Sequence, residues 1–282
     1  DRLRLENELR YAISQNELVL HYQPIVRASS GAVAGVEALI RWQHPTRGLL
    51  APAHFISPAE VSGLIVPIGE WVIQTACRQL RQWQKKFDYP MTVALNLSAR
   101  QFQHADLVAQ IRTAIIESGI DPSTLEVEIT ESSAMQNAEN TIFTLRELKQ
   151  LGVKIAMDDF GTGYSSLSCL QRFAFSKVKI DRSFMADIES GSVNLAIVRA
   201  ILGLCRDLRI DVIAEGVETA EQAALLRQEN CRLLQGYLYG KPKPFLEVAA
   251  DHAVTLLGQV HGRASASAAP LAVEKRTVHK PL

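Results

Sequence analysis

Apolar residues follow two different spacings along this chain, and the change between them divides it. Residues 18–26 and 33–42 are apolar, β-branched runs typical of strands, and a turn over residues 27–31 joins them. A connection this short can join only antiparallel neighbours, because a parallel crossover needs about a dozen residues or more. We therefore predict that one of these two strands runs against the rest of its sheet.

From residue 70 onward, apolar residues recur at helical spacing and alternate with short strand-like runs. Besides a loose helical stripe at 3–13 and a short helical turn at 166–173, helices are predicted over 70–87, 105–117, 138–151, 193–208 and 219–229. The strands between them are predicted over 92–97, 125–130, 155–157, 177–181, 211–217 and 233–239. Eight strands, most of them followed by helices, predict an α/β fold, a (β/α)8 TIM-like barrel.

Composition sets the limits of this fold. The chain has 282 residues, 47% of them hydrophobic, which is enough for one large core. No Pro/Ser-rich linker interrupts residues 1–257, so one barrel domain is expected there. Residues 258–282 are Ala, Ser and scattered charge, and we expect a low-complexity tail that is mostly disordered.

Charge and cysteine content narrow the functional classes. Lys+Arg and Asp+Glu balance at 30 each, so a broad basic surface for duplex nucleic acid is not expected. The four Cys lack CxxC spacing and are expected to be reduced thiols of a cytoplasmic domain. No apolar run approaches the ~18 residues of a membrane span, and no signal peptide is visible. The chain begins inside a predicted helix, as an excised part of a longer protein would.

Polar side chains interrupt the apolar strands near their ends. Asp158 and Asp159 directly follow a buried strand, where two adjacent carboxylates repel each other and require a neighbouring cation. In such barrels the chemistry lies at the carboxyl ends of the strands. The other strands offer Glu37, Asn96, Glu126, Glu128 with Glu131 beyond it, Lys179 with Asp181, Glu215 with Glu218, and Gln235. We expect these groups to converge at one mouth.

The types of these side chains indicate which metal they could hold. Carboxylates and one amide oxygen, without His or Cys, favour Mg²⁺ or Mn²⁺ over Zn²⁺. There are enough carboxylates for two ions that share a bridging ligand. Two ions about 4 Å apart can polarise phosphoryl oxygens, generate hydroxide and stabilise a leaving oxygen. Lys179 would be held charged among these anions, where it could orient the attacking water.

Several short motifs resemble one family. Glu37-Ala38-Leu39 followed by Arg41 resembles the signature of the EAL-domain phosphodiesterases, which hydrolyse the bacterial messenger cyclic di-GMP to linear pGpG. The resemblance extends in order over roughly residues 1–250, through Tyr22-Gln-Pro-Ile25, Asn96-Leu-Ser98, Glu128-Ile-Thr-Glu131, Asp158-Asp-Phe-Gly161, Lys179-Ile-Asp181, Glu215-Gly-Val-Glu218 and Gln235-Gly-Tyr237.

The resemblance implies a barrel whose first strand is antiparallel to the others and a two-metal mechanism with a metal-activated water. It assigns one ion to Glu37, Asn96, Glu128 and Asp158, and the second to Asp158, Asp159 and Glu215. It makes Lys179 the contact of the nucleophilic water, and it assigns support of the water, a metal or the substrate to Gln235 and Glu218. It also assigns a phosphate contact to Arg41, support of the site around Lys179 to Asp181, and a place in the substrate pocket to Gln23. Ca²⁺ is expected to bind but inhibit, because it is larger and acidifies bound water less.

The resemblance also implies partners. Family members often form homodimers through the segment after the Asp-Asp pair, here residues 161–173, with Glu131, Phe160 and Gly161 supporting that loop. They usually carry sensory, receiver, membrane or diguanylate cyclase (GGDEF) modules, which are expected upstream of Asp1.

Other interpretations remain open at this stage. A cyclic di-GMP receptor without turnover would be expected if a ligand carboxylate or Lys179 were replaced, and none is. A metal-assisted lyase or a glycosidase could use the same barrel, but a glycosidase would not need Asn96, Lys179 and a double Asp around one centre. Arg41 could pair with a nearby acid instead of a phosphate.

Overall fold

The computed structural model of this chain describes residues 2–87, 91–162, 170, 173, 175–188 and 191–248. The tail predicted over residues 258–282 lies outside the described residues, as does most of the helical turn predicted over 166–173. No helix in the described ranges combines the length and the apolar character that crossing a bilayer requires.

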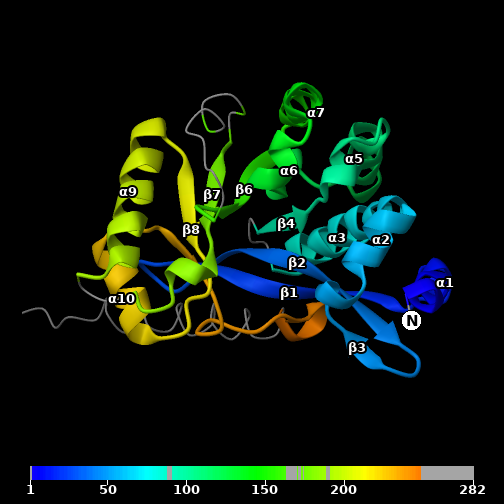
Figure 1. The fold of residues 1–282 in the computed structure, drawn as a ribbon, viewed down its shortest axis with the longest axis horizontal. Helices are drawn as coiled ribbons and strands as arrows, with labels where there is room; N and C mark the ends of the chain where they lie inside the picture. Colours follow the sequence, from blue (N-terminus) through cyan, green and yellow to red (C-terminus); the bar gives the residue numbers. More distant parts are fainter. Residues whose placement is uncertain are drawn as a thin grey trace, which may run out of the picture.

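Eight strands form a closed barrel surrounded by helices (Figure 1). The neighbours follow the order β1-β9-β8-β7-β6-β5-β4-β2, and pairing of β1 with β2 closes the ring. The strands are β1 (Leu18–Arg27), β2 (Val33–His44), β4 (Thr92–Asn96), β5 (Leu125–Thr130), β6 (Lys154–Phe160), β7 (Lys177–Ile180), β8 (Asp211–Ala214) and β9 (Leu233–Gln235). The predicted fold class is confirmed.

The hairpin at the start of the barrel sets the direction of its strands. β1 pairs antiparallel with both β2 and β9, whereas β2 is parallel to β4 and every later neighbour in the ring is parallel. β1 is therefore the reversed strand, as the short turn and the family resemblance predicted. Gly31 closes that turn with a φ of 69°, a left-handed conformation that suits glycine.

Helices cover the outside of the barrel. They are α1 (Arg2–Ala12), α2 (Ile56–Ser62), α3 (Ile65–Phe87), α4 (Ala99–Phe102), α5 (Leu107–Ser118), α6 (Glu131–Met135), α7 (Ala138–Gln150), α9 (Val193–Leu208) and α10 (Ala220–Gln228). Short 3-10 turns are η1 (Pro52–His54), η2 (Pro122–Thr124) and η3 (Arg182–Phe184). α9 has the predicted bounds, and α10 begins with the expected capping box of Thr219 and Gln222.

Most element boundaries differ from the sequence prediction by one to five residues, and three of the differences have a local cause. α3 begins at residue 65 rather than 70, because Pro67 is tolerated within the first turn of a helix. β8 ends at Ala214 rather than 217, because Gly216 turns the chain with a φ of 70°. β9 ends at Gln235 rather than 239, where Gly236 packs directly on the backbone of Val217. The strands β3 (Gly48–Leu50) and β10 (Lys243–Pro244) were not predicted.

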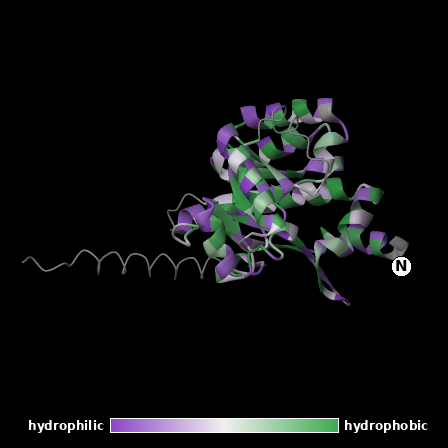
Figure 2. Ribbon diagram, turned by 60° about the vertical axis from the view of Figure 1, so that its left-hand side comes forward, coloured by the Kyte–Doolittle hydropathy of each residue, from purple (hydrophilic) through white to green (hydrophobic). Residues whose placement is uncertain are grey.

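The hydrophobic core lies between the barrel wall and the helices. Outward-facing strand residues such as Val93 and Val127 are fully buried with helix residues such as Leu80 and Ile111. A smaller cluster joins α1 and α2 to Trp42 on β2. In Figure 2 the central strands are largely green, whereas the outer helices carry purple stretches. The inside of the barrel near its mouth is different, because charged side chains are buried there.

Candidate active site

Seven strands bring their polar side chains to the carboxyl end of the barrel. A cavity of about 220 Å³ opens there between side chains of β1, β2, β6, β7 and β9 and the loop after β8. Its lining includes the predicted residues Gln23, Glu37, Asp158, Lys179, Glu215, Glu218 and Gln235. Residues up to 212 positions apart in sequence thus share one site, since Gln235 donates to Gln23.

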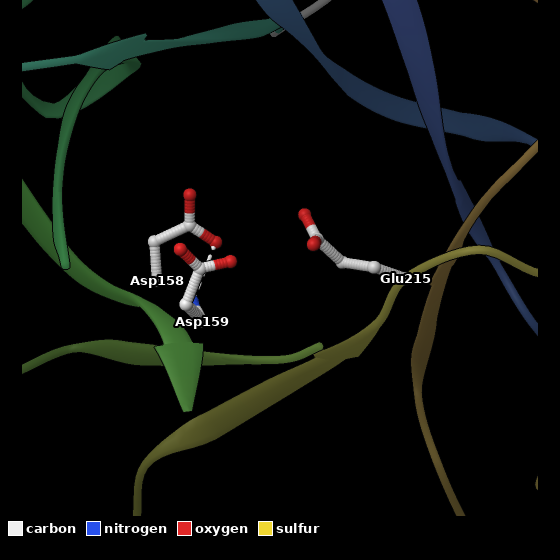
Figure 3. Close-up of side chains that lie close together, drawn as sticks. All are labelled: Asp158, Asp159 and Glu215. Carbon is white, nitrogen blue, oxygen red and sulfur yellow. Dashed lines mark hydrogen bonds between the residues drawn. The ribbon is translucent and has the colours of Figure 1, made fainter. Parts of the chain in front are cut away.

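A bulge at the end of β6 aims the adjacent aspartates. The register between β6 and β7 shifts between Met157 and Phe160, and Asp159 adopts a φ of 54°. Such an irregularity re-aims side chains at the end of a strand. Asp158 accepts a hydrogen bond from the backbone N–H of Asp159 (3.0 Å). In Figure 3 the two carboxylates lie side by side and face Glu215, and one oxygen from each of the three lies within 4.8 Å of the others.

Lys179 is the centre of the charge cluster. Its Nζ lies 2.6 Å from Glu128 and 2.7 Å from Glu215, and its side chain is 1% exposed. It also contacts Asp158 at 3.3 Å and Glu37 at 3.4 Å. Burial lowers the pKa of Lys179, but the four carboxylates raise it by more than burial lowers it, so the pKa lies well above the usual value for lysine. This rise in pKa favours the charged form of Lys179.

Glu37 is held by two amides as well as by Lys179. Asn96 donates to one of its oxygens and Gln235 to the other, each at 2.5 Å. Burial raises the pKa of Glu37, but Lys179 and the two amides outweigh burial, and the net pKa is lowered. Gln235 also donates to Gln23 at 3.2 Å, which joins β1, β2 and β9 in one network.

The remaining carboxylates exceed the positive charge available. Burial is the main cause that raises the pKa of Glu128 and of Asp159, and neighbouring carboxylates add to it. The same two causes raise the pKa of Glu215 to about 8. Glu128 Oε1 is buried without a hydrogen-bond partner among the described residues. Five carboxylates surround one lysine, an imbalance that divalent cations would remove.

This donor set fits hard cations. Asp158, Asp159 and Glu215 are close enough to bind one ion together. The carboxylates of Glu37 and Glu128, with that of Asp158, all contact Lys179, and Asn96 is bonded to Glu37. Carboxylate and amide oxygens of this kind are the ligands that hard divalent cations prefer, so the acidic cluster could bind a metal ion.

Three other predicted residues lie outside the charge cluster around Lys179, and of these only Glu218 lines the cavity. Arg41 is half-buried and donates to its neighbour Ile40 (2.8 Å); no ion pair of Arg41 with an acid occurs among the described residues. Asp181 accepts from the backbone of Ser183 (2.9 Å) and caps η3, so it has a local structural role. Glu218 is exposed at the rim of the cavity.

The residues predicted to support the dimerisation loop lie at the ends of β5 and β6, next to the candidate ligands. Glu131 is 7% exposed at the start of α6, and Phe160 is buried at the end of β6. Gly161 has a φ of 98°, and a Cβ there would meet the ring of Phe184 at 2.8 Å. The rest of the predicted dimerisation loop, apart from Thr162, Leu170 and Phe173, lies outside the described residues.

The structure adds residues that the sequence did not single out as ligands. Arg182 and Leu39 line the cavity, and so does Tyr237, on whose ring Lys241 stacks at 5.1 Å. Tyr237 belongs to the Gln-Gly-Tyr motif, which could have indicated it. Glu126 was grouped with the converging acids, but it lies deeper in the barrel and forms its ion pair with Lys177 at 2.7 Å.

Comparison with known proteins agrees with this geometry. A model of the EAL domain family matches residues 6–242. An uncharacterized signaling protein of Caulobacter vibrioides is 50% identical over 244 residues, which are 86% of this chain and 30% of that protein. The bifunctional diguanylate cyclase/cyclic di-GMP phosphodiesterase MucR of Pseudomonas aeruginosa is 47% identical over 251 residues, 89% of this chain and 37% of that protein.

A solved structure extends the similarity to three dimensions. The PaMucR phosphodiesterase in complex with c-di-GMP aligns with a TM-score of 0.83 at 47% identity, over 87% of this chain and 99% of that one. The chain spans about a third of the length of the two curated relatives. The family match covers well over half of the chain. This chain belongs to the EAL domain family.

Proposed function

We propose that this domain hydrolyses cyclic di-GMP to linear pGpG with the help of two divalent cations. One observation carries the proposal: four carboxylates contact the buried Lys179 at the barrel mouth, and a fifth, that of Asp159, lies beside two of them. The amides of Asn96 and Gln235 hold one of the four, Glu37. The similarity to a c-di-GMP complex of MucR supports the choice of substrate.

The proposed cations are Mg²⁺ or Mn²⁺. We assign one to Glu37, Asn96, Glu128 and Asp158, and the other to Asp158, Asp159 and Glu215. When bound, such ions supply a hydroxide nucleophile at neutral pH and stabilise charge on the phosphoryl and leaving oxygens.

The residues of the chain orient the reactants around these ions. The charged ammonium of Lys179 can donate a hydrogen bond to the attacking water and offset the charge that develops on the phosphate. Gln235 fixes Glu37 and thereby the ligand geometry on β2. We assign substrate contacts to Gln23, Arg41 and Glu218 around the mouth, and support of the Lys179 loop to Asp181.

The direct test is incubation with cyclic di-GMP and Mg²⁺, followed by chromatography. We expect linear pGpG to accumulate with Mg²⁺ or Mn²⁺, to be absent in EDTA, and to form very slowly with Ca²⁺. Full conversion in EDTA would contradict the metal-dependent mechanism. Tight binding of cyclic di-GMP without product, in the presence of Mg²⁺ and Mn²⁺, would instead indicate the alternative function, a receptor without turnover.

We further propose that the domain acts as a homodimer in the cytoplasm and responds to a linked sensory or GGDEF module. The greater length of its curated relatives leaves room for such modules. We assign dimerisation to residues 161–173. Sedimentation should show a dimer whose dissociation lowers turnover, and an equally active monomer would contradict this assignment.

A further inference from the structure

A second lysine–glutamate pair lies inside the barrel beneath the candidate metal centre. Lys177 Nζ donates to both carboxylate oxygens of Glu126, at 2.8 and 2.7 Å. The side chain of Glu126 is 2% exposed and that of Lys177 is 12% exposed. No motif of the proposed mechanism uses either residue.

This pair repeats the geometry of the pair above it. Glu126 and Glu128 are two residues apart on β5, and Lys177 and Lys179 are two residues apart on β7. Side chains two apart on a strand share a face, with their Cα atoms about 7 Å apart. The two pairs are therefore successive layers of the same barrel interior.

A small residue on the intervening strand makes room for the lower pair. β6 lies between β5 and β7, and its residue Ala156 aligns with Glu128 on one side and with Lys177 on the other. Ala156 is fully buried. Because its side chain is a single methyl group, the lysine stem can cross β6 and reach the glutamate.

The two layers differ in charge balance. Both oxygens of Glu126 are bonded to Lys177, so the lower layer is neutral and saturated. In the upper layer Glu128 Oε1 has no partner within the described ranges, and the carboxylates outnumber Lys179. An unneutralised charge in the lower layer would act on the mouth through a medium of low dielectric constant.

We propose that Glu126 and Lys177 form a layer without net charge beneath the mouth, called here the neutral floor. The balance between their two charges sets the affinity of the mouth for divalent cations. The inference rests on the proposed function only in requiring that the mouth binds such cations. Neither residue touches the cations or the substrate; they act through the electric field beneath Glu128. Loss of Glu126 leaves a positive charge under the site, and loss of Lys177 leaves a negative one, so the two substitutions act in opposite directions.

The test measures Mn²⁺ binding to the substrate-free chain by electron paramagnetic resonance. Glu126→Gln should weaken Mn²⁺ affinity by about tenfold or more and Lys177→Gln should strengthen it, since a unit charge about 7 Å away is only partly screened in the barrel interior. The double variant should return to within about threefold of the parent, because the floor is neutral again. Glu229→Gln is the matched control, as it breaks a pair with Arg199 on the outside of the barrel, where the arginine is 53% exposed, and it should leave affinity unchanged.

The pattern of results separates this inference from the proposed function. A purely structural role would weaken binding in both single variants and weaken it further in the double variant. That pattern, or a Lys177→Gln variant with unchanged affinity, would overturn the neutral floor while leaving the metal site intact. Absence of Mn²⁺ binding by the parent would overturn both. Thermal unfolding of each variant confirms that the barrel is folded during the measurement.

Discussion

The two ends of the barrel carry opposite charge, and they do so by different means. At the mouth, five carboxylates surround Lys179. At the other end, a cavity of about 720 Å³ is lined by arginines, with Asp211 among them: Arg27, Arg206, Arg227 and Arg232. The equal numbers of acidic and basic residues in the sequence conceal this separation.

Burial distinguishes the two ends more than charge does. Glu128 is 1% exposed, whereas the side chains of Arg206 and Arg232 are 77% and 82% exposed. The two arginines lie 3.7 Å from their acidic neighbours, and exposed pairs of this kind contribute about 0–1 kcal/mol. Buried carboxylates in excess of cations are unfavourable for folding by several kcal/mol. Of these two ends, only the mouth keeps such an unfavourable arrangement among the residues that the structure describes, and that makes it the candidate for function.

The largest effect should follow from removing a ligand at the mouth. Glu37→Ala or Asp158→Ala should lower the turnover of cyclic di-GMP by about a hundredfold or more, because each removes a carboxylate proposed to bind a cation. Both variants should remain folded, since the hydrophobic core lies between the barrel wall and the helices and includes neither residue. The measurement is the initial rate of pGpG formation at saturating Mg²⁺. A parental rate in either variant would refute the ligand assignment.

A large loss of stability should follow from removing the ammonium group of Lys179 at the mouth. Lys179→Met leaves four contacting carboxylates without their partner, and breaking such a buried pair costs about 3–5 kcal/mol in unfolding free energy. Urea denaturation in EDTA measures this loss. Mg²⁺ should restore part of it by binding the folded state. Equal stability of parent and variant in EDTA would show that the acids do not depend on Lys179.

The sequence was sufficient to predict the barrel and the convergence of the mouth. The five-residue turn before Val33 required an antiparallel hairpin, and the strand-end carboxylates required a common mouth once the strands were parallel. Both inferences use local spacing and the geometry of sheets. The predicted strand ends at residues 217 and 239 were wrong. The first strand stops earlier at the turn made by Gly216, and the second stops where Gly236 packs on Val217, a long-range contact that local spacing does not reveal.

The pairing of charges inside the barrel could not be predicted for a related reason. Glu126 and Glu128 have the same residue type and face, yet one binds Lys177 and the other Lys179. The choice depends on the register of β5, β6 and β7 and on the small side chain of Ala156 between them. The bulge that aims Asp158 and Asp159 is likewise a property of the pairing with β7.

Two glycines with similar backbone conformation, one at each end of the barrel, differ in how closely their surroundings are packed. Gly216 at the mouth and Gly31 at the opposite end have nearly equal φ values, 70° and 69°. A Cβ at Gly216 would lie 2.4 Å from Arg182 Cβ, whereas nothing lies within 4 Å at Gly31. Gly31→Ala should therefore cost about 1 kcal/mol from backbone strain alone, and Gly216→Ala about 2–4 kcal/mol.

Turnover should separate these two variants further. Gly216→Ala should lower the rate because Glu215, the adjacent residue, moves with the displaced turn. Gly31→Ala should retain the parental rate, since it lies at the other end of the barrel. Urea denaturation and initial rates on the same two preparations make the comparison. Equal losses in both variants would show that the contact with Arg182 is not tight.

The smallest effect should come from the arginine end. Arg232→Gln removes a contact of 3.7 Å with Asp211 between two largely exposed side chains, and surface changes of this kind usually stay within about 0.5 kcal/mol. Turnover of cyclic di-GMP should equal that of the parent, because no proposed ligand or substrate contact lies at this end. Urea denaturation and initial rates are measured for Arg232→Gln and for Glu37→Ala in parallel, so that the large loss of rate expected in Glu37→Ala serves as the reference. A marked loss of rate in Arg232→Gln would mean that the exposed arginines act on the mouth through the barrel, and that burial alone does not identify the functional end.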